Sequence, residues 1–193
     1  MPLYDFQKEA LAETEGLNRV GYFLDMGLGK TFVGGAKAAR LNNRVNLIVC
    51  QLSKIKDWQE HMTNVEHIQA YDLRRKKELS CFLELAATKE TIQIVGIINY
   101  DLVFRRPELL GLTGFTLMLD ESSLIQNRTA KRTKAILRMR PKNVVLLSGT
   151  PTSGKYENLW SQLHLLGWDI GHQLYQDNYV NWKKITVRGM LIS

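Results

Sequence analysis

A glycine-rich segment with a lysine and a threonine is the first feature of this sequence that can do chemistry. It runs DMGLGKT from Asp25 to Thr31, between an apolar stretch and an amphipathic one. Glycines in such a turn let backbone N–H groups close around phosphate oxygens, and the start of the following helix adds a favourable dipole. Lys30 can then reach the β- and γ-phosphates of a nucleotide, and the Thr31 hydroxyl can join a magnesium shell. The segment therefore predicts a nucleotide phosphate site.

Two common glycine patterns do not fit this segment. A dinucleotide-binding GxGxxG loop would need glycine where Phe32 stands. A strict GxxxxGK[ST] loop would need glycine at Leu24. Taken alone, the segment leaves open a glycine-rich turn whose lysine is merely solvated.

Two adjacent acids, Asp120 and Glu121, follow the apolar stretch from Phe115 to Leu119. Adjacent strand residues point opposite ways, but at the carboxyl end of a strand both can face the crevice where parallel sheets bind ligands. Asp120 is placed to hold magnesium through water, and Glu121 to orient and deprotonate an attacking water. Acids that only cap the next segment are the structural alternative, and the phosphate loop argues against it.

A further polar segment, SGTP from Ser148 to Pro151, follows the apolar run from Val144 to Leu147. In a parallel sheet its hydroxyls would lie beside the two carboxylates, because the carboxyl ends of the strands share one edge. Ser148, Gly149 and Thr150 can then pass a nucleotide-dependent shift to a bound partner. Taken alone, SGTP is an ordinary turn.

Short apolar stretches alternate with longer amphipathic segments, which is typical of a parallel sheet covered by helices. We expect strands at 20–25, 45–50, 66–71, 92–98, 115–120 and 143–148. We expect helices at 30–41, 55–63, 74–87, 129–139 and 156–166. The pattern weakens after Gly167, and no element is assigned there. The sequence therefore predicts one α/β domain with a mainly parallel sheet.

Composition limits the class of protein. A chain of 193 residues with 45% hydrophobic and 23% charged residues fits one globular domain and excludes disordered and fibrous proteins. The net charge of +7 favours a polyanionic partner. No apolar run approaches the ~20 residues of a membrane helix, and the first residues lack a secretory signal. Two cysteines without a CxxC pair and four histidines without ligand spacing predict no zinc site and a reducing, cytoplasmic location.

Read in order, these motifs resemble the first RecA-like lobe of superfamily-two helicases, and most closely the Swi/Snf group of DNA translocases. LYDFQKEAL at 3–11 is similar to the adenine-reading Q motif, DMGLGKT to the DEMGLGKT loop, and LDESS at 119–123 to the DEAH box. LSGTP at 147–151, with the later ENLW at 157–160, is similar to the LTGTP…ELW block. Further similar segments are 47–60, 97–101 and 125–128. The resemblance covers residues 3–167 and implies a RecA-like P-loop NTPase fold of three layers.

The resemblance also implies cofactors, partners and site residues. The cofactors are ATP and Mg²⁺, and the partners are duplex DNA and a second RecA-like lobe, in a longer chain or a partner protein. The nucleotide-binding residues are Phe6, Gln7, Met26, Gly27, Leu28, Gly29, Lys30 and Thr31. The catalytic residues are Lys30, Asp120 and Glu121, the metal residues are Thr31 and Asp120, and the coupling residues are Ser148, Gly149 and Thr150. The nucleic-acid-binding residues are Ser53, Lys54, Asn99, Tyr100, Asn127 and Arg128.

Departures from the family pattern modify these expectations. Ser122 and Ser123 replace the Ala-His of the DEAH box, so the coupling role of that histidine does not transfer. DESS boxes of this kind resemble those of phage and prophage members. Nothing after Gly167 resembles a second lobe with its arginine finger. We therefore expect a helicase ATP-binding domain at 1–167, a C-terminal extension at 168–193, and little ATP hydrolysis by this chain alone.

Other interpretations stay open at this stage. A non-catalytic single lobe that binds DNA or protein would use the same residues. A small P-loop kinase would suit the length, but Leu24 and the order of the acid pair and the SGTP segment count against it. The basic run at 74–77 is either a DNA contact or a solvated helix start. Trp58 and Trp160 are expected in the core, and Phe6 is either a stacking partner or a core residue.

Overall fold

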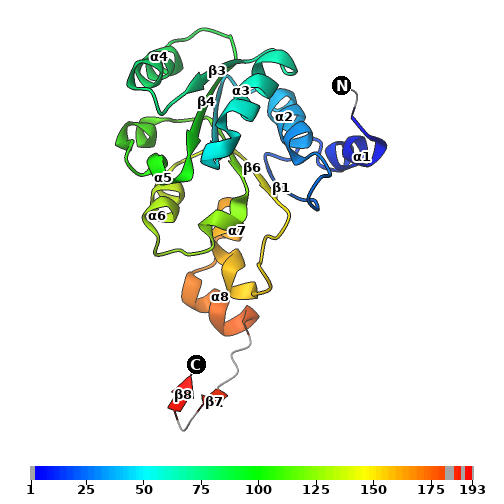
Figure 1. Ribbon diagram of the computed structural model, residues 1–193, viewed down its shortest axis with the longest axis vertical. Coiled ribbons are helices and arrows are strands. Elements are labelled where there is room, and N and C mark those ends of the chain that lie inside the picture. Colours follow the sequence, from blue (N-terminus) through cyan, green and yellow to red (C-terminus); the bar gives the residue numbers. More distant parts are fainter. Residues whose placement is uncertain (1–2, 181–184, 188–189, 193) are drawn as a thin grey trace.

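A six-stranded sheet forms the centre of the molecule, between two layers of helices (Figure 1). The computed structural model describes residues 3–180, 185–187 and 190–192. The strands are β1 (Arg19–Phe23), β2 (Val45–Cys50), β3 (Gln69–Asp72), β4 (Ile94–Asn99), β5 (Thr116–Asp120) and β6 (Asn143–Ser148). Their order is β1-β6-β5-β2-β4-β3, and every neighbouring pair is parallel. The predicted α/β fold with a parallel sheet is confirmed.

Two apolar cores attach the helices to the two faces of the sheet. One face packs against α1 (Asp5–Glu13), α2 (Lys30–Arg40) and α3 (Ile55–Asn64). The other face packs against α4 (Lys76–Ala87), α5 (Tyr100–Val103), α6 (Lys131–Arg138) and α7 (Trp160–Leu165). Within β2, Leu47 and Val49 enter the second core while Ile48 and Cys50 enter the first. This alternation explains why strands buried on both faces have a continuous apolar sequence.

Shorter elements complete the described part of the chain. Four 3₁₀ turns occur, η1 (Leu52–Lys54), η2 (Pro107–Gly111), η3 (Ser122–Ile125) and η4 (Tyr156–Leu159). After α7 come α8 (His172–Tyr179) and an antiparallel pair, β7 (Ile185–Val187) and β8 (Met190–Ile192). Among the described residues, no helix has the length and apolar character that crossing a membrane requires.

The strand register brings the polar strand ends together. Phe23 at the end of β1 is level with Ser148 at the end of β6. Asp120 at the end of β5 is level with Leu147, one residue before Ser148. Because all these strands run in the same direction, the phosphate loop, the acid pair and the SGTP segment leave the sheet at one edge.

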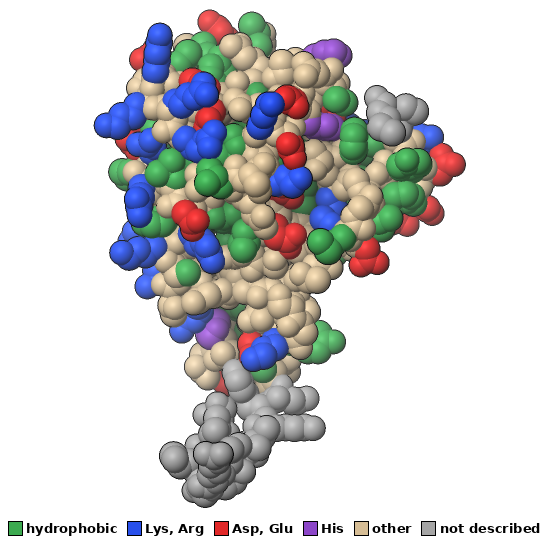
Figure 2. All heavy atoms as spheres, viewed as in Figure 1, with side chains coloured by type: hydrophobic (Ala, Val, Ile, Leu, Met, Phe, Trp, Pro, Cys, Tyr) green, Lys and Arg blue, Asp and Glu red, His purple; other side chains and the backbone are tan. Residues whose placement is uncertain are grey.

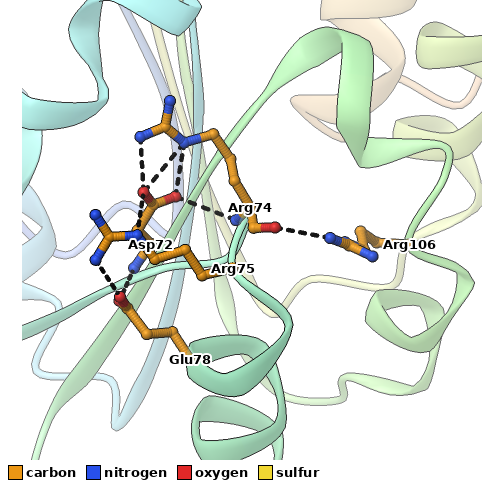
Figure 3. A network of polar contacts seen from close by, with 5 residues as sticks. All are labelled: Asp72, Arg74, Arg75, Glu78 and Arg106. Atoms are coloured by element: carbon orange, nitrogen blue, oxygen red, sulfur yellow. Dashed lines mark hydrogen bonds and ion pairs between the residues drawn. The ribbon is translucent and has the colours of Figure 1, made fainter.

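The helix expected from residue 74 begins only at Lys76, because a polar cluster holds the preceding turn (Figure 3). Asp72 is 1% exposed and accepts hydrogen bonds from Nε and Nη2 of Arg74 at 2.9 and 2.7 Å. Arg75 pairs with Glu78 at 2.9 Å, and Arg106 donates to the Arg74 carbonyl at 2.8 Å. The two arginines of the basic run therefore stabilise the β3–α4 turn.

Other element boundaries also differ from expectation. The helix expected at 156–166 is the 3₁₀ turn η4 followed by α7, and the helix expected at 129–139 is the shorter α6. Helices α1, α5 and α8 were not expected. Trp58 is fully buried as predicted, but Trp160 is only partly buried, so the core expectation for it is wrong. Its indole N–H instead reaches the surface segment after α7 and donates to the Ile170 carbonyl at 2.8 Å.

Candidate nucleotide site

A cavity of about 460 Å³ opens at the carboxyl edge of the sheet. The loops after β1, β2 and β5 form its walls. Its lining residues are Met26, Gly27, Gly29, Lys30, Thr31, Gln51, Lys54, Asp120 and Glu121. The structure thus brings the predicted phosphate, metal and water-orienting residues into one cavity. Gln51 also lines this cavity and was not predicted to lie there.

The phosphate loop is closed on its own carbonyl groups. Lys30 Nζ donates to the carbonyl oxygens of Leu24 and Asp25, at 3.0 and 3.2 Å. Gly27 and Gly29 have φ angles of 82° and 70°, which favour glycine. Phosphate oxygens are stronger acceptors for an ammonium group than neutral carbonyls. The Lys30 side chain can therefore exchange its present partners for a bound phosphate.

Gln7 connects helix α1 to this loop. Its Nε2 donates to the Leu28 carbonyl at 2.9 Å, and its Oε1 accepts from the Tyr4 N–H at 3.0 Å. A Cβ at position 29 would lie 2.6 Å from Gln7 Nε2, so Gly29 also permits this close approach. Gln7 is 2% exposed, and one amide hydrogen remains for a ligand. Phe6 is 40% exposed and stacks on Tyr4, so it is not a core residue.

Asp120 is held by a buried indole. Trp58 on α3 is 0% exposed, and its Nε1 donates to Asp120 Oδ2 at 2.8 Å. Burial raises the pKa of Asp120 above its ordinary value, and the hydrogen bond from Trp58 opposes that rise. The bond fixes one carboxylate oxygen against the helix, so the other oxygen can serve a cation. The sequence suggested only a packing role for Trp58.

Glu121 has a constrained backbone and two hydroxyl partners. Its φ and ψ are 60° and 62°, in the left-handed region that non-glycine residues rarely adopt. Ser123 Oγ and Ser148 Oγ both donate to its Oε1, at 2.7 and 2.5 Å. Tyr100 is 3% exposed, and its hydroxyl lies 3.1 Å from the Asp120 carbonyl oxygen and 3.3 Å from that of Glu121. Tyr100 thus braces the acid pair with its hydroxyl, and only a small part of its side chain is exposed for the predicted contact with nucleic acid.

The other residues predicted to bind nucleic acid differ in their exposure and surroundings. Lys54 lines the nucleotide cavity and pairs with Asp57 at 2.9 Å, which raises the pKa of Lys54. Asn99 is 8% exposed and lines a second cavity of about 190 Å³, which shares Gln51 with the nucleotide cavity. Ser53, Asn127 and Arg128 are exposed. Of the six residues predicted to bind nucleic acid, Lys54 alone therefore lines the nucleotide cavity.

A basic face that was not predicted lies on helix α6. Figure 2 shows Lys and Arg side chains along the margin formed by α4, α5 and α6. Lys131, Lys134 and Arg138 are exposed and, together with Arg106, line a cavity of about 320 Å³. Within the described ranges, none of the first three forms an ion pair. The spacing of three and four residues in the sequence KRTKAILR could have revealed this face.

Known proteins share this fold and sequence pattern. The chain aligns over 92% of its length with 38% of the Sulfolobus solfataricus SWI2/SNF2 ATPase core in complex with dsDNA, with a TM-score of 0.74 and 21% identity. It is 32% identical over 178 residues to the zebrafish (Danio rerio) DNA excision repair protein ERCC-6-like, covering 82% of this chain. It is 27% identical over 203 residues to CHROMATIN REMODELING 5 of Arabidopsis thaliana, covering 95% of this chain. The chain spans 12% of the length of each of these two relatives.

The family model of the SNF2-related domain matches residues 18–188. This match includes the phosphate loop, the acid pair and the SGTP segment. The chain therefore belongs to the SNF2-related family and forms the first RecA-like lobe of a superfamily-two helicase core.

Proposed function

We propose that this chain is the Mg-ATP-binding lobe of a DNA translocase that couples ATP hydrolysis to movement on duplex DNA. The observation that supports this most strongly is the single cavity shared by Lys30, Thr31, Asp120 and Glu121. Its volume of about 460 Å³ is in the usual range for small-ligand sites.

The side chains present in the cavity suit Mg-ATP. Lys30 and the glycine amides of the loop would bind the β- and γ-phosphates. Thr31 and Asp120 would hold magnesium, a hard cation that binds oxygen ligands and keeps several waters. When bound, Mg²⁺ neutralises charge on the phosphates. Glu121 would orient the attacking water through Oε2, since its Oε1 already has two partners. Lys54, which also lines the cavity, would add positive charge near the phosphates.

Adenine recognition would come from the α1 side of the loop. Phe6 is exposed and offers an aromatic face. The remaining amide hydrogen of Gln7 offers a donor to the purine, while its other contacts hold Leu28 in place. Ser148, Gly149 and Thr150 would report the state of the nucleotide to bound DNA.

Duplex DNA would contact the exposed side chains beyond the cavity. Ser53, Asn127 and Arg128 can reach phosphates and sugars, and the basic face of α6 begins three residues after Arg128. Such contacts fix the register on DNA without selecting a base sequence. A second RecA-like lobe, in a longer chain or in a partner protein, would supply the arginine finger that completes ATP hydrolysis.

Titration of Mg-ATP into this chain by calorimetry tests the nucleotide assignment. We expect modest affinity for the wild type and no measurable binding by Lys30→Ala. Glu121→Gln should bind Mg-ATP about as well as the wild type, because its task is the water. Lys142→Ala, a matched lysine change far from the cavity lining, should also leave binding intact. Equal affinity of the wild type and Lys30→Ala would exclude the proposed phosphate site.

A further inference from the structure

We propose that Ser122 and Ser123 are positioning residues that tie the acid pair to the SGTP segment through two separate hydrogen-bond relays. These serines stand where the family has Ala-His, so the coupling function of that histidine has no direct substitute in the sequence. The proposal deepens the proposed function and rests on it, because the relays would transmit the state of the nucleotide.

The first relay passes through Glu121. Ser123 Oγ and Ser148 Oγ donate to the same oxygen, Glu121 Oε1, at 2.7 and 2.5 Å. Ser148 Oγ in turn accepts from the Thr150 N–H at 3.2 Å. A rotation of the Glu121 side chain must break both hydroxyl contacts and disturb the acceptor of the Thr150 amide. The conformation of Glu121 and that of the SGTP segment are therefore linked.

The second relay bypasses Glu121. Ser122 Oγ donates to Gln162 Oε1 at 2.7 Å, and Gln162 Nε2 donates to the Pro151 carbonyl at 2.7 Å. Gln126 Nε2 donates to the same carbonyl at 3.1 Å. Ser122 and Gln162 are both 0% exposed, so water cannot replace a lost partner. A shift of the acid pair on β5 thereby reaches Pro151 through α7.

The backbone around the acid pair is suited to transmit such a shift. Glu121 has a left-handed conformation, and the Tyr100 hydroxyl holds the carbonyl groups of Asp120 and Glu121. Both relays begin at neighbouring residues of η3 and end at neighbouring residues, Thr150 and Pro151. Both relays therefore connect the serines to the Thr150–Pro151 end of the SGTP segment.

Amide hydrogen exchange of residues 149–155 in this chain tests the two relays without nucleotide. Ser122→Ala and Ser123→Ala should each raise the exchange rate of Thr150 and the amides that follow by about tenfold. Ser161→Ala is the matched control, because Ser161 is 1% exposed and its hydroxyl has no hydrogen-bond partner among the described residues. It should change these rates by less than about twofold. Ser123→Thr keeps the hydroxyl and should restore rates close to those of the wild type.

The same measurement with saturating Mg-ATP tests the coupling. Nucleotide should change the exchange of these amides in the wild type and in Ser161→Ala, but much less in Ser122→Ala and Ser123→Ala. A normal nucleotide response of both alanine variants, with binding confirmed by calorimetry, would overturn the relays and leave the proposed function standing. A wild type that binds no Mg-ATP would overturn the proposed function and the coupling to nucleotide. The exchange rates without nucleotide would still show whether Ser122 and Ser123 hold the SGTP segment. If the nucleotide-free exchange rates of Ser122→Ala and Ser123→Ala equal those of Ser161→Ala, the two hydrogen-bond relays are overturned.

Discussion

Replacing Trp58 by phenylalanine should separate the two contributions of this buried indole. The change retains most of the ring but removes the 2.8 Å hydrogen bond to Asp120 Oδ2. A hydrogen bond to a charged group contributes about 1.5–3 kcal/mol, and the lost part of a fully buried ring adds about 1 kcal/mol. We expect the free energy of unfolding to fall by about 3 kcal/mol. For a chain of this size, that corresponds to a melting temperature about 6–12 °C lower.

The cost of Trp58→Phe should depend on pH in a defined direction. Burial holds the pKa of Asp120 above its unfolded value, and the Trp58 hydrogen bond limits that rise. Ionised Asp120 therefore opposes folding above its folded pKa, and more strongly once the indole donor is gone. As pH falls through that pKa, the carboxyl group becomes protonated and the missing donor matters less. Urea unfolding should thus show a larger loss of stability at pH 8 than at pH 5.

Trp160→Phe is the matched control for this experiment. Its indole also donates at 2.8 Å, but to the neutral carbonyl of Ile170. A backbone carbonyl does not ionise, so this hydrogen bond is the same at pH 5 and at pH 8. The cost of Trp160→Phe should therefore not decrease at pH 5. If Trp58→Phe lowers the free energy of unfolding equally at both pH values, or by less than about 1 kcal/mol, the hydrogen bond from Trp58 does not stabilise ionised Asp120.

Three further predictions test other parts of the structure. Gln7→Ala should weaken ATP binding and remove a preference for ATP over GTP of about 1–3 kcal/mol, measured by calorimetry. Equal affinities of the wild type for ATP and GTP would exclude an adenine-reading role. Arg74→Ala should reduce the free energy of unfolding by about 1.5–3 kcal/mol, because buried Asp72 loses its principal partner. The exposed control Lys77→Ala should cost less than about 0.5 kcal/mol, with both variants measured by urea unfolding, and equal costs would argue against a stabilising role of the Asp72–Arg74 contact. Arg128→Glu and Lys134→Glu should each weaken binding to duplexes of any sequence and reduce its salt dependence, as seen by fluorescence anisotropy; a salt-independent affinity of the wild type would contradict phosphate contacts.

The sheet was predictable because its strands are buried on both faces. Strands 45–50 and 143–148 were predicted with the observed bounds, since continuous apolar runs flanked by polar residues mark both ends. The helix predicted at 74–87 began two residues too early. Arg74 binds the Asp72 carboxylate at the end of β3 and so belongs to the turn before α4. Helix α1 was missed because only Gln7 and Leu11 are buried in it, which gives a weak apolar pattern.

The members of the site were predictable from local motifs, but their partners were not. The phosphate loop and the acid pair each lie within a few residues of sequence. The contact of Trp58 with Asp120 joins residues 62 positions apart, and that of Ser122 with Gln162 joins residues 40 positions apart. The burial of Tyr100 also depends on the packing of α5 against the sheet. Contacts of this kind are set by the packing of helices on the sheet, which a single sequence does not specify.

Single-turnover ATP hydrolysis by this chain, with and without duplex DNA, tests the central claim most directly. We expect this chain to bind Mg-ATP but scarcely to hydrolyse it. The arginine finger, which contributes about 10³–10⁵ to the rate in comparable enzymes, would come from a second lobe. Glu121→Gln should therefore change the already low rate very little. A DNA-stimulated rate of about one per second or faster, lost in Glu121→Gln, would show that the described cavity completes its own catalytic site and would contradict the account.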